Sequence, residues 1–218
     1  IMSIIYPDEG SVEVLGGKPL NEVLQERVFG PLGMNDTAFQ LRSDQLPRLA
    51  ALFTAKDGGV ELVDPANQSS SWARPVTMFS GGGGLISTVG DYLRFTEAMR
   101  RKGELEGTRI LGRRTVELMT MNHLPGNVDL TAMGQPVFSE TAFDGIGFGL
   151  GFSVVMDVAA SKGACSVGEH AWGGAASTAF WIDPVEDISV VFMTQVLPSS
   201  SYPIRRELRA LVYQSLVD

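Results

Sequence analysis

Apolar residues recur at helical spacing in four stretches of the chain. In the first stretch, Leu20 and Val23 begin an apolar stripe with intervals of three and four residues, the spacing that buries one side of a helix. Pro31 and Gly33 are predicted to end this helix, and Thr88 is predicted to cap the start of the second. The four predicted helices cover about 19–29, 88–102, 112–121 and 203–216. The predicted buried face of the second helix comprises Val89, Tyr92, Leu93, Phe95 and Met99.

Bulky β-branched and aromatic residues form shorter runs in the C-terminal third, and such runs predict strands. The segment Asp183-Pro-Val-Glu-Asp187 separates the last two runs and is typical of a turn, so we expect an antiparallel hairpin there. The predicted strands lie at about 147–157, 177–183 and 187–194, with short strands earlier at 37–41 and 60–63. Helices on a mainly antiparallel sheet make an α+β domain, and we expect this fold class.

The composition fits one compact domain. Of the 218 residues, 44% are hydrophobic and 19% are charged, which is ordinary for a globular protein. The net charge of −8 argues against nucleic acid or an acidic membrane as a partner, because both require clustered Lys and Arg. No apolar run approaches the length of a membrane span, and the sequence indicates no particular compartment. Cys165 is the only cysteine, so the chain cannot form an internal disulfide, and no ligand spacing predicts a metal or a cofactor.

The most informative segment runs from Glu169 to Pro184 and contains two adjacent glycines, Gly173 and Gly174. Where side chains are absent, a ligand can approach the backbone closely, and an N–H group that faces a cleft is the usual donor to a developing oxyanion. A bend between two strands explains the same glycines equally well. The glycine pair alone therefore leaves a ligand site and a plain turn as alternatives.

Four segments together resemble the C-terminal part of serine β-lactamase-like hydrolases, the group of class C β-lactamases, family VIII carboxylesterases and penicillin-binding-protein-like enzymes. The segments are Pro19–Phe39, Phe79–Phe95, Gly147–Phe152 and His170–Pro184, and they occur in the order of that family. The resemblance implies a partial β-lactamase/transpeptidase-like fold. It also implies a small-molecule ester or β-lactam substrate that is hydrolysed through an acyl-enzyme.

The resemblance also implies site residues. Trp172-Gly173-Gly174 stands where the penicillin-recognising enzymes carry Lys-Thr-Gly, so the backbone N–H of Ala175 is implied to be an oxyanion donor. Trp172, Gly173, Gly174 and His170 are expected to bind the substrate. Because tryptophan replaces a lysine that would hold a substrate carboxylate, we expect esterase rather than β-lactamase chemistry.

The sequence departs from the family pattern at the nucleophile. No serine is followed by a lysine three residues on, and in the nearest match, Ser71-Trp-Ala-Arg74, a guanidinium cannot act as a base. The family's catalytic tyrosine would align near Ile1, and Tyr6 is out of register with that position. We therefore expect residues 1–218 to form a single domain that corresponds to the C-terminal portion of the family fold, without its Ser-x-x-Lys part.

Two alternatives follow from this departure. In the first, Ser177 or Ser80 serves as an alternative nucleophile with His170 as base and Asp183 or Glu169 beside it, although no motif requires such a triad. In the second, the chain is a non-catalytic truncated homologue. It would then associate through an exposed sheet face, as a homo-oligomer or by pairing with a missing N-terminal segment.

Three further features are a long polar segment, a histidine and the cysteine. The segment from Leu124 to Asp144 is predicted to be a long loop that borders the substrate cleft. His123, at its start, is expected to be structural rather than catalytic. Cys165 is expected to be a half-buried structural thiol.

Overall fold

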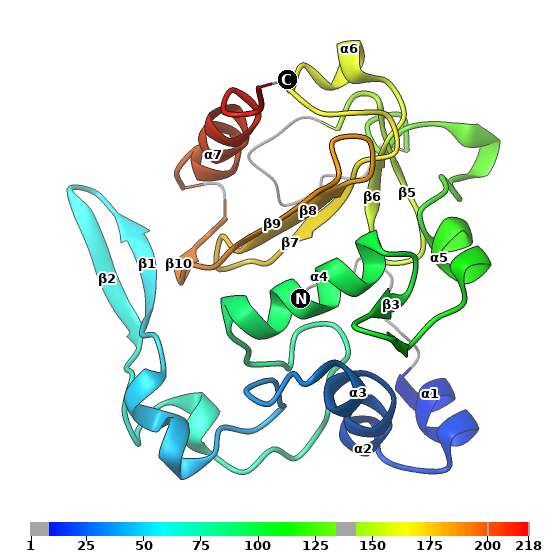
Figure 1. Ribbon diagram of the computed structural model, residues 1–218. Helices are drawn as coiled ribbons and strands as arrows, with labels where there is room; N and C mark the ends of the chain where they lie inside the picture. The colour runs from blue at the N-terminus through cyan, green and yellow to red at the C-terminus, as the bar shows by residue number, and fades with distance from the viewer. Residues whose placement is uncertain (1–8, 134–142, 200, 218) are drawn as a thin grey trace.

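A five-stranded antiparallel sheet forms the centre of the protein (Figure 1). The computed structural model describes residues 9–133, 143–199 and 201–217, so Tyr6 and most of the C-terminal half of the predicted 124–144 loop lie outside the described residues. The strands follow the order β5 (Ile146–Phe148), β6 (Ser153–Val155), β7 (His170–Gly173), β8 (Ala179–Asp183) and β9 (Ile188–Phe192). The predicted α+β class is confirmed.

The turn between β8 and β9 is held by its first residue. Asp183 accepts hydrogen bonds on Oδ1 from the backbone N–H groups of Val185, at 2.9 Å, and Glu186, at 3.2 Å. The register pairs Phe180 with Val191 and places the two strands antiparallel. The hairpin that the sequence predicts is therefore confirmed.

Helices cover both faces of this sheet (Figure 1). The two covering helices are α4 (Val89–Arg100) and α7 (Ile204–Tyr213). Successive side chains of a strand point to opposite faces. Accordingly, Phe180 of β8 packs against Tyr92 of α4 with ring centroids 5.3 Å apart, whereas Trp181 lies beneath the guanidinium of Arg209 on α7. The sheet is the middle of three layers.

The other elements surround this three-layer core. The N-terminal part contains α1 (Glu9–Gly16), α2 (Leu20–Leu24), the π-helical turn η1 (Gln25–Phe29), α3 (Gly30–Leu32) and the 3₁₀ turns η2 (Ser43–Arg48) and η3 (Ser71–Ala73). The later part contains the hairpin β3 (Glu104–Leu105) and β4 (Thr108–Arg109), α5 (Arg113–Met119), η4 (Pro125–Asn127) and α6 (Val158–Ser161). A second sheet has the order β10 (Val196–Leu197), β1 (Leu52–Lys56) and β2 (Gly59–Asp64).

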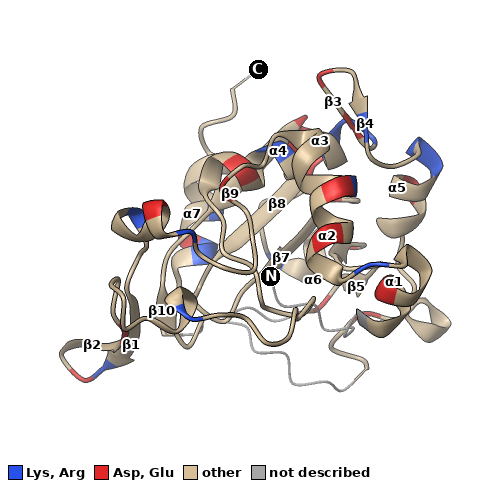
Figure 2. Cartoon of the chain, turned by 90° about the horizontal axis from the view of Figure 1, so that it is seen from below, with Lys and Arg blue, Asp and Glu red and all other residues tan. Residues whose placement is uncertain are grey.

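Charges of both signs are interspersed on the outer elements. Figure 2 shows basic and acidic segments side by side around the β3–β4 hairpin and α5. Arg109 pairs there with Glu104, and Arg113 pairs with Glu117 at 2.7 Å. Such exposed pairs contribute little to stability. In the described ranges no helix is long and apolar enough to cross a membrane.

The first predicted helix exists but ends later than expected. Helical backbone continues through η1 and α3 as far as Leu32, so the prediction that Pro31 ends it is wrong. Proline lies in the first turn of α3, where its fixed φ suits a helix and its missing N–H is tolerated. Gly33 ends the helix with a left-handed φ of 66°, as its position in the sequence predicts.

The predicted strands need three corrections. The 147–157 stretch is divided into β5 and β6 by a turn, and the 37–41 stretch contributes only the isolated bridge between Ala38 and Ile86. The 60–63 stretch lies within β2 as expected, but its partner β1 was not predicted. Asp57-Gly58 joins these two strands, and Gly58 has a φ of 80°, so this dipeptide was the available hairpin signal.

Helix α4 begins as predicted, since Thr88 Oγ1 accepts a hydrogen bond from the N–H of Asp91 at 3.2 Å. Its buried face differs in part from the predicted one, because Val89 and Leu93 are exposed. Ala98 is fully buried instead, in a cluster with Phe29, Leu32, Met34 and Leu105. A small residue at this point allows α4 to lie close to the N-terminal helices. Ala98 is buried because its side chain is small, which a hydropathy pattern does not indicate.

Candidate functional site

Strand β7 ends in a tight turn that carries Ala175. Gly173 is the last residue of β7 to pair with β8, opposite Ala179. The N–H of Gly174 then donates to the carbonyl of Thr178 at 3.0 Å, and the N–H of Ser177 donates to the carbonyl of Gly174 at 3.1 Å. Ala175 occupies the second position of the resulting four-residue turn and is exposed.

The backbone N–H of Ala175 lies outside the sheet ladder. Among the described residues, it donates no hydrogen bond. A strand residue would normally use this group in pairing, whereas the turn leaves it available for a ligand atom. An N–H that is not used in sheet pairing is one requirement of an oxyanion donor.

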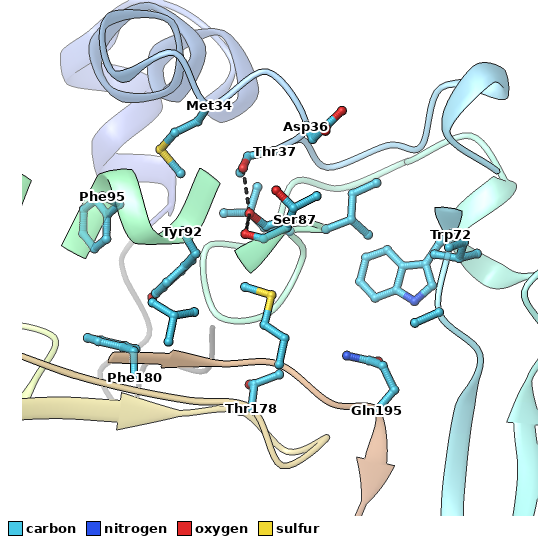
Figure 3. Close-up of a pocket in the computed structure, with 18 of the residues that line it drawn as sticks. Met34, Asp36, Thr37, Trp72, Ser87, Tyr92, Phe95, Thr178, Phe180 and Gln195 are labelled. Carbon is cyan, nitrogen blue, oxygen red and sulfur yellow. Dashed lines mark hydrogen bonds between the residues drawn. The ribbon is translucent and has the colours of Figure 1, made fainter. Parts of the chain in front are cut away.

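A cavity of about 410 Å³ lies next to this turn, between the sheet, α4 and the N-terminal helices (Figure 3). Its wall on the sheet side includes Trp172, Gly173, Gly174 and Thr178, while Ala175 itself is not part of the lining. Most of the remaining wall is apolar. The apolar contributors include Leu24, Phe29, Met34, Leu85, Tyr92, Phe95, Phe180 and Met193.

Aromatic contacts hold Trp172 in the wall. Its ring meets Phe148 edge-on at a centroid distance of 5.0 Å and lies 6.4 Å from Phe143. The indole Nε1 is buried and has no hydrogen-bond partner in the described part of the chain. Trp172 therefore presents an apolar surface and one unused donor.

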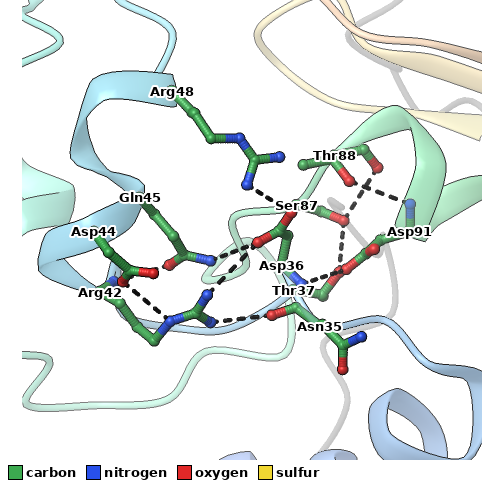
Figure 4. A network of polar contacts seen from close by, with 10 residues as sticks. All are labelled: Asn35, Asp36, Thr37, Arg42, Asp44, Gln45, Arg48, Ser87, Thr88 and Asp91. Atoms are coloured by element: carbon green, nitrogen blue, oxygen red, sulfur yellow. Dashed lines mark hydrogen bonds and ion pairs between the residues drawn. The ribbon is translucent and has the colours of Figure 1, made fainter.

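Three polar side chains are hydrogen-bonded to one another at the opposite wall, of which Thr37 and Ser87 line the cavity and Asp91 lies behind them (Figure 4). Asp91 accepts on Oδ2 from the hydroxyl of Thr37 at 2.9 Å and from the N–H of Asp36 at 2.7 Å. The hydroxyl of Ser87 lies 2.7 Å from that of Thr37. Thr37 gives its only proton to Asp91, so the single proton of Ser87 has two acceptors within reach, the hydroxyl of Thr37 and, at 3.4 Å, the carbonyl of Thr88. Sequence reasoning missed Thr37 and Ser87, because no local motif connects them to Asp91.

A second polar group lies beside this chain (Figure 4). Gln45 donates to Asp36 at 3.0 Å, and Arg48 pairs with the same carboxylate at 2.7 Å. The hydrogen bond from Gln45 and that from Arg48 hold the pKa of Asp36 below its ordinary value. Asp36 is thus an anion at neutral pH that is already occupied by two partners.

His170 does not reach the cavity wall. The residue is buried, its Nδ1 lies 3.1 Å from the carbonyl oxygen of Gly168, and its ring meets Phe152 edge-on. Burial lowers the pKa of His170, so the imidazole is neutral near pH 7. The predicted substrate contact by His170 gains no support from this placement, whereas Trp172, Gly173 and Gly174 do line the cavity.

The alternative triad is not assembled in the structure. The hydroxyl of Ser177 donates to the carbonyl of Val196 at 2.7 Å, and Ser80 accepts from the N–H of Gly82. Within the described ranges, no hydrogen bond joins either hydroxyl to His170. The expectation of a Ser177–His170 pair is therefore corrected, because the turn after β7 directs Ser177 towards the β10 side.

Glu169 and His170 point to opposite faces of the sheet, as adjacent strand residues do. Glu169 is 2% exposed and forms an ion pair with Arg209 of α7. The hydroxyl of Tyr213 donates to Glu169 and lies 2.7 Å from Asp183 Oδ2. These groups form a buried cluster under α7, on the face away from the cavity.

The remaining candidates are Cys165, His123 and the 124–144 loop. Burial raises the pKa of the half-buried Cys165 thiol, which disfavours the reactive thiolate. His123 Nε2 lies 2.7 Å from the carbonyl of Leu118, near the end of α5. Phe143 is the described end of the predicted 124–144 loop, and it contacts the cavity residue Trp172. In the part of the chain that the structure describes, no group of three or more His, Cys, Asp or Glu side chains could hold a metal ion.

Comparison with protein families and curated proteins gives consistent matches. The Beta-lactamase family model matches residues 10–214. Two Mycobacterium tuberculosis proteins, Protein Rv1367c of strain H37Rv and Uncharacterized protein MT1414 of strain CDC 1551, are each 32% identical over 190 residues. The matches cover 84% of this chain and 45% of the relatives, so the chain spans about half of their length.

Solved structures show the same similarity. EstCE1, a hydrolase with promiscuous acyltransferase activity, is 26% identical with a TM-score of 0.75, and the match covers 93% of this chain and 52% of EstCE1. Simvastatin synthase LovD from Aspergillus terreus is 23% identical with a TM-score of 0.80, over 96% of this chain and 54% of LovD. A β-lactamase from Mycobacterium bovis is 21% identical with a TM-score of 0.58, over 95% and 58% of the two chains.

Proposed function

The chain belongs to the Beta-lactamase family, and from this premise we propose that it supplies the oxyanion-holding turn and the cleft wall of a serine hydrolase. The proposed reaction is hydrolysis of a small carboxylic ester through an acyl-enzyme. The fold neighbour EstCE1 is itself a hydrolase with acyltransferase activity, which supports acyl chemistry in this branch.

One observation carries the proposal: the N–H of Ala175, at the end of β7 and beside the cavity, has no hydrogen-bond partner in the described part of the chain. When a nucleophile attacks an ester carbonyl, the oxygen acquires negative charge, and a fixed N–H donor stabilises that charge without reorganisation. The turn fixes the donor because the N–H and the C=O of the preceding residue, Gly174, are both hydrogen-bonded. Ala175 would act only through its backbone, so its side chain is free to vary.

The surroundings support an apolar acyl group. Trp172 presents its ring to the cavity, and Met34, Phe95 and Phe180 continue the apolar surface. Trp172 is uncharged where the Lys-Thr-Gly enzymes carry their lysine, so the side chain at this position cannot pair with a substrate carboxylate. This favours an ester over a carboxylate-bearing β-lactam. The sequence has no Ser-x-x-Lys motif, and the nucleophile is the part of the proposal that these residues do not supply.

The position of Ala175 in its turn allows the N–H to be deleted selectively. Proline is favoured at the second residue of such turns and has no N–H, so Ala175→Pro removes the donor and keeps the turn. In a form of the protein that includes the nucleophile, hydrolysis of p-nitrophenyl butyrate is expected to lose about 10²- to 10³-fold in kcat, the usual effect of losing one oxyanion donor.

Ala175→Gly is the matched control, because it keeps the N–H and is expected to retain nearly full activity. Equal kcat in the proline variant and the wild type, with an unchanged melting temperature, would refute the role of this amide. Faster turnover of nitrocefin than of the ester would redirect the proposal from esterase to β-lactamase chemistry.

A second candidate function is a non-catalytic protein that associates through its sheet. Because α4 and α7 cover the two faces, the expected association through an exposed sheet face is corrected to association through a sheet edge. Strand β9 forms an end of the five-stranded sheet, and no strand in the described ranges pairs with its outer edge. An apolar edge such as Ile188–Phe192 offers unused N–H and C=O groups to another strand. Sedimentation of the purified chain distinguishes the candidates, since a monodisperse monomer without a co-purified chain would count against association.

A further inference from the structure

Arg205, in the first turn of α7, contacts the same turn that carries Ala175. Its Nη2 donates to the carbonyl oxygen of Gly174 at 2.7 Å and to that of Thr178 at 2.7 Å. Hydrogen bonds from a charged donor are stronger than those between neutral groups. One guanidinium nitrogen thus connects the two strand ends where β7 leaves the sheet and β8 enters it.

The carbonyl that Arg205 holds belongs to the same peptide group as the proposed oxyanion donor. The C=O of Gly174 and the N–H of Ala175 lie in one plane, and in a trans peptide they point in opposite directions. In the structure this bond is trans. Arg205 from one element and Ser177, whose N–H lies 3.1 Å away, both fix the carbonyl. The direction of the Ala175 N–H is fixed with it.

A hydrogen bond to the carbonyl oxygen also changes how strongly the N–H of the same peptide donates a hydrogen bond. Hydrogen bonds in a chain polarise one another, so a positive donor at the carbonyl oxygen makes the N–H of the same peptide a better donor. The positive charge of Arg205 therefore acts on the oxyanion position through the peptide, without contact with the substrate.

The glycine at position 173 is explained by this contact. A Cβ on Gly173 would lie 2.7 Å from Arg205 Nη2 and 2.7 Å from the carbonyl oxygen of Thr178. A Cβ on Gly174 would lie 2.5 Å from the hydroxyl of Thr178. The space above Gly173 is occupied by the arginine, so on this side the missing side chain admits a protein group rather than a ligand.

We propose that Arg205 is a positioning residue for the oxyanion donor: it holds and polarises the Gly174–Ala175 peptide so that the N–H of Ala175 faces the substrate. The inference rests on the proposed function, in which that N–H binds the acyl oxygen. Arg205 itself does not touch the reacting atoms.

The sequence allows this peptide to be observed directly. Glycine is followed by alanine at only two places, Gly163–Ala164 and Gly174–Ala175. Labelling with carbonyl-carbon-13 glycine and nitrogen-15 alanine therefore gives two correlation peaks in an HNCO spectrum of the intact protein. The Gly163–Ala164 peak serves as an internal reference.

In Arg205→Ala, the Gly174–Ala175 peak is expected to move in both the carbon and the nitrogen dimension, while the reference peak stays in place. Arg205→Lys keeps a charged donor and is expected to move the peak less. Arg206→Ala, at an exposed position on the same helix, is the matched control and is expected to move neither peak. An unmoved Gly174–Ala175 peak in Arg205→Ala would overturn the inference.

Ester turnover then separates positioning from simple structural support. Arg205→Ala is expected to lower kcat on the order of tenfold with little change in KM, less than the loss when a donor is removed outright, and Arg205→Lys is expected to restore part of it. A moved peak with unchanged kcat would overturn the positioning role and leave the Ala175 donor intact.

The proposed function and the role of Arg205 are refuted by different outcomes. In the form that includes the nucleophile, a wild-type kcat in Ala175→Pro, or no ester turnover before any substitution, would refute the oxyanion donor and with it the role of Arg205. A peak shift in Arg205→Ala would in that case report only a structural contact.

Discussion

The two faces of the central sheet are stabilised by opposite physical means. The face under α4 is apolar: Tyr92, Phe152, Phe180 and Ile182 form one cluster there, and the cavity opens beside it. The face under α7 buries charge instead, with the Glu169 carboxylate enclosed by Arg209 and Tyr213. The same strands contribute to both faces, because successive side chains of a strand point to opposite faces.

This difference indicates which face of the sheet can adapt to a ligand and which face is rigid. Apolar contacts are non-directional, so the α4 face can border a cavity and accept different ligand shapes. The α7 face consists of directional hydrogen bonds, which fix the position of α7 against the sheet. Arg205 belongs to α7, and its contact with the Ala175 turn depends on that fixed position. The charged face thereby supports the site on the other side.

Arg209→Met is the substitution expected to change stability most. It leaves the carboxylate of Glu169, 2% exposed, without its ion-pair partner. Breaking a buried pair in this way costs about 3–5 kcal/mol. Because the side chain of Arg209 is 25% exposed, we expect a loss of about 3 kcal/mol, at the low end of that range. Urea denaturation measures it. Arg206→Met, on the same helix, should change stability by less than about 0.5 kcal/mol, and an equally small change in Arg209→Met would show that the α7 face does not depend on this pair.

Ile182→Val tests the apolar face. Ile182 is fully buried on β8, and removal of one methylene from a packed core costs about 0.5–1.5 kcal/mol. The loss should therefore be clearly smaller than that of Arg209→Met. Val185→Ala removes apolar atoms from an exposed position in the next turn and serves as the control. A loss above that of Arg209→Met would reverse the ranking of the two faces.

Glu169→Gln tests the protonation of the charged face and should have the smallest effect, about 1 kcal/mol or less, because the amide keeps an acceptor oxygen and the remaining cation, Arg209, is 25% exposed and can be hydrated. Burial raises the pKa of Glu169, and the charges and hydrogen bonds of Arg209 and Tyr213 oppose this only in part. A raised native pKa means that the folded protein binds the proton more tightly, so this group lowers stability as pH rises from the ordinary glutamate pKa through the native one.

Glutamine removes that titration. The melting temperature of Glu169→Gln minus that of the wild type is therefore expected to increase with pH across this window. Glu207→Gln, exposed on α7, is the control for a general charge effect. A difference that falls with rising pH would mean that the ion pair with Arg209 dominates and that the pKa of Glu169 is lowered.

Local sequence signals predicted much of the secondary structure. Thr88 and Asp91 mark the start of α4, the segment after Asp183 forms the β8–β9 turn, and α5 and α7 lie within their predicted ranges. Each of these depends on interactions within a few residues, which a sequence displays. The missed strand β1 had such a signal at Asp57-Gly58, which the polar composition of the region obscured.

The site was predictable only in part. The Trp172-Gly173-Gly174 segment indicated the cavity wall, and the resemblance supplied the expectation for Ala175. Thr37 and Ser87 are 50 residues apart in the sequence, and Arg205 lies 31 residues from Gly174. No periodicity connects such pairs, because their contact follows from the packing of α4 and α7 on the sheet.

The sequence by itself determined the α+β class, the family resemblance and the position of the glycine turn, because these are written in short-range spacing and residue type. Only the tertiary structure decided that the N–H of Ala175 has no hydrogen-bond partner among the described residues, that His170 is enclosed in the core, and that an arginine occupies the space above Gly173. These outcomes depend on which surfaces meet when the layers pack. Such contacts join residues that are distant in the sequence, so they depend on the packing of the whole chain.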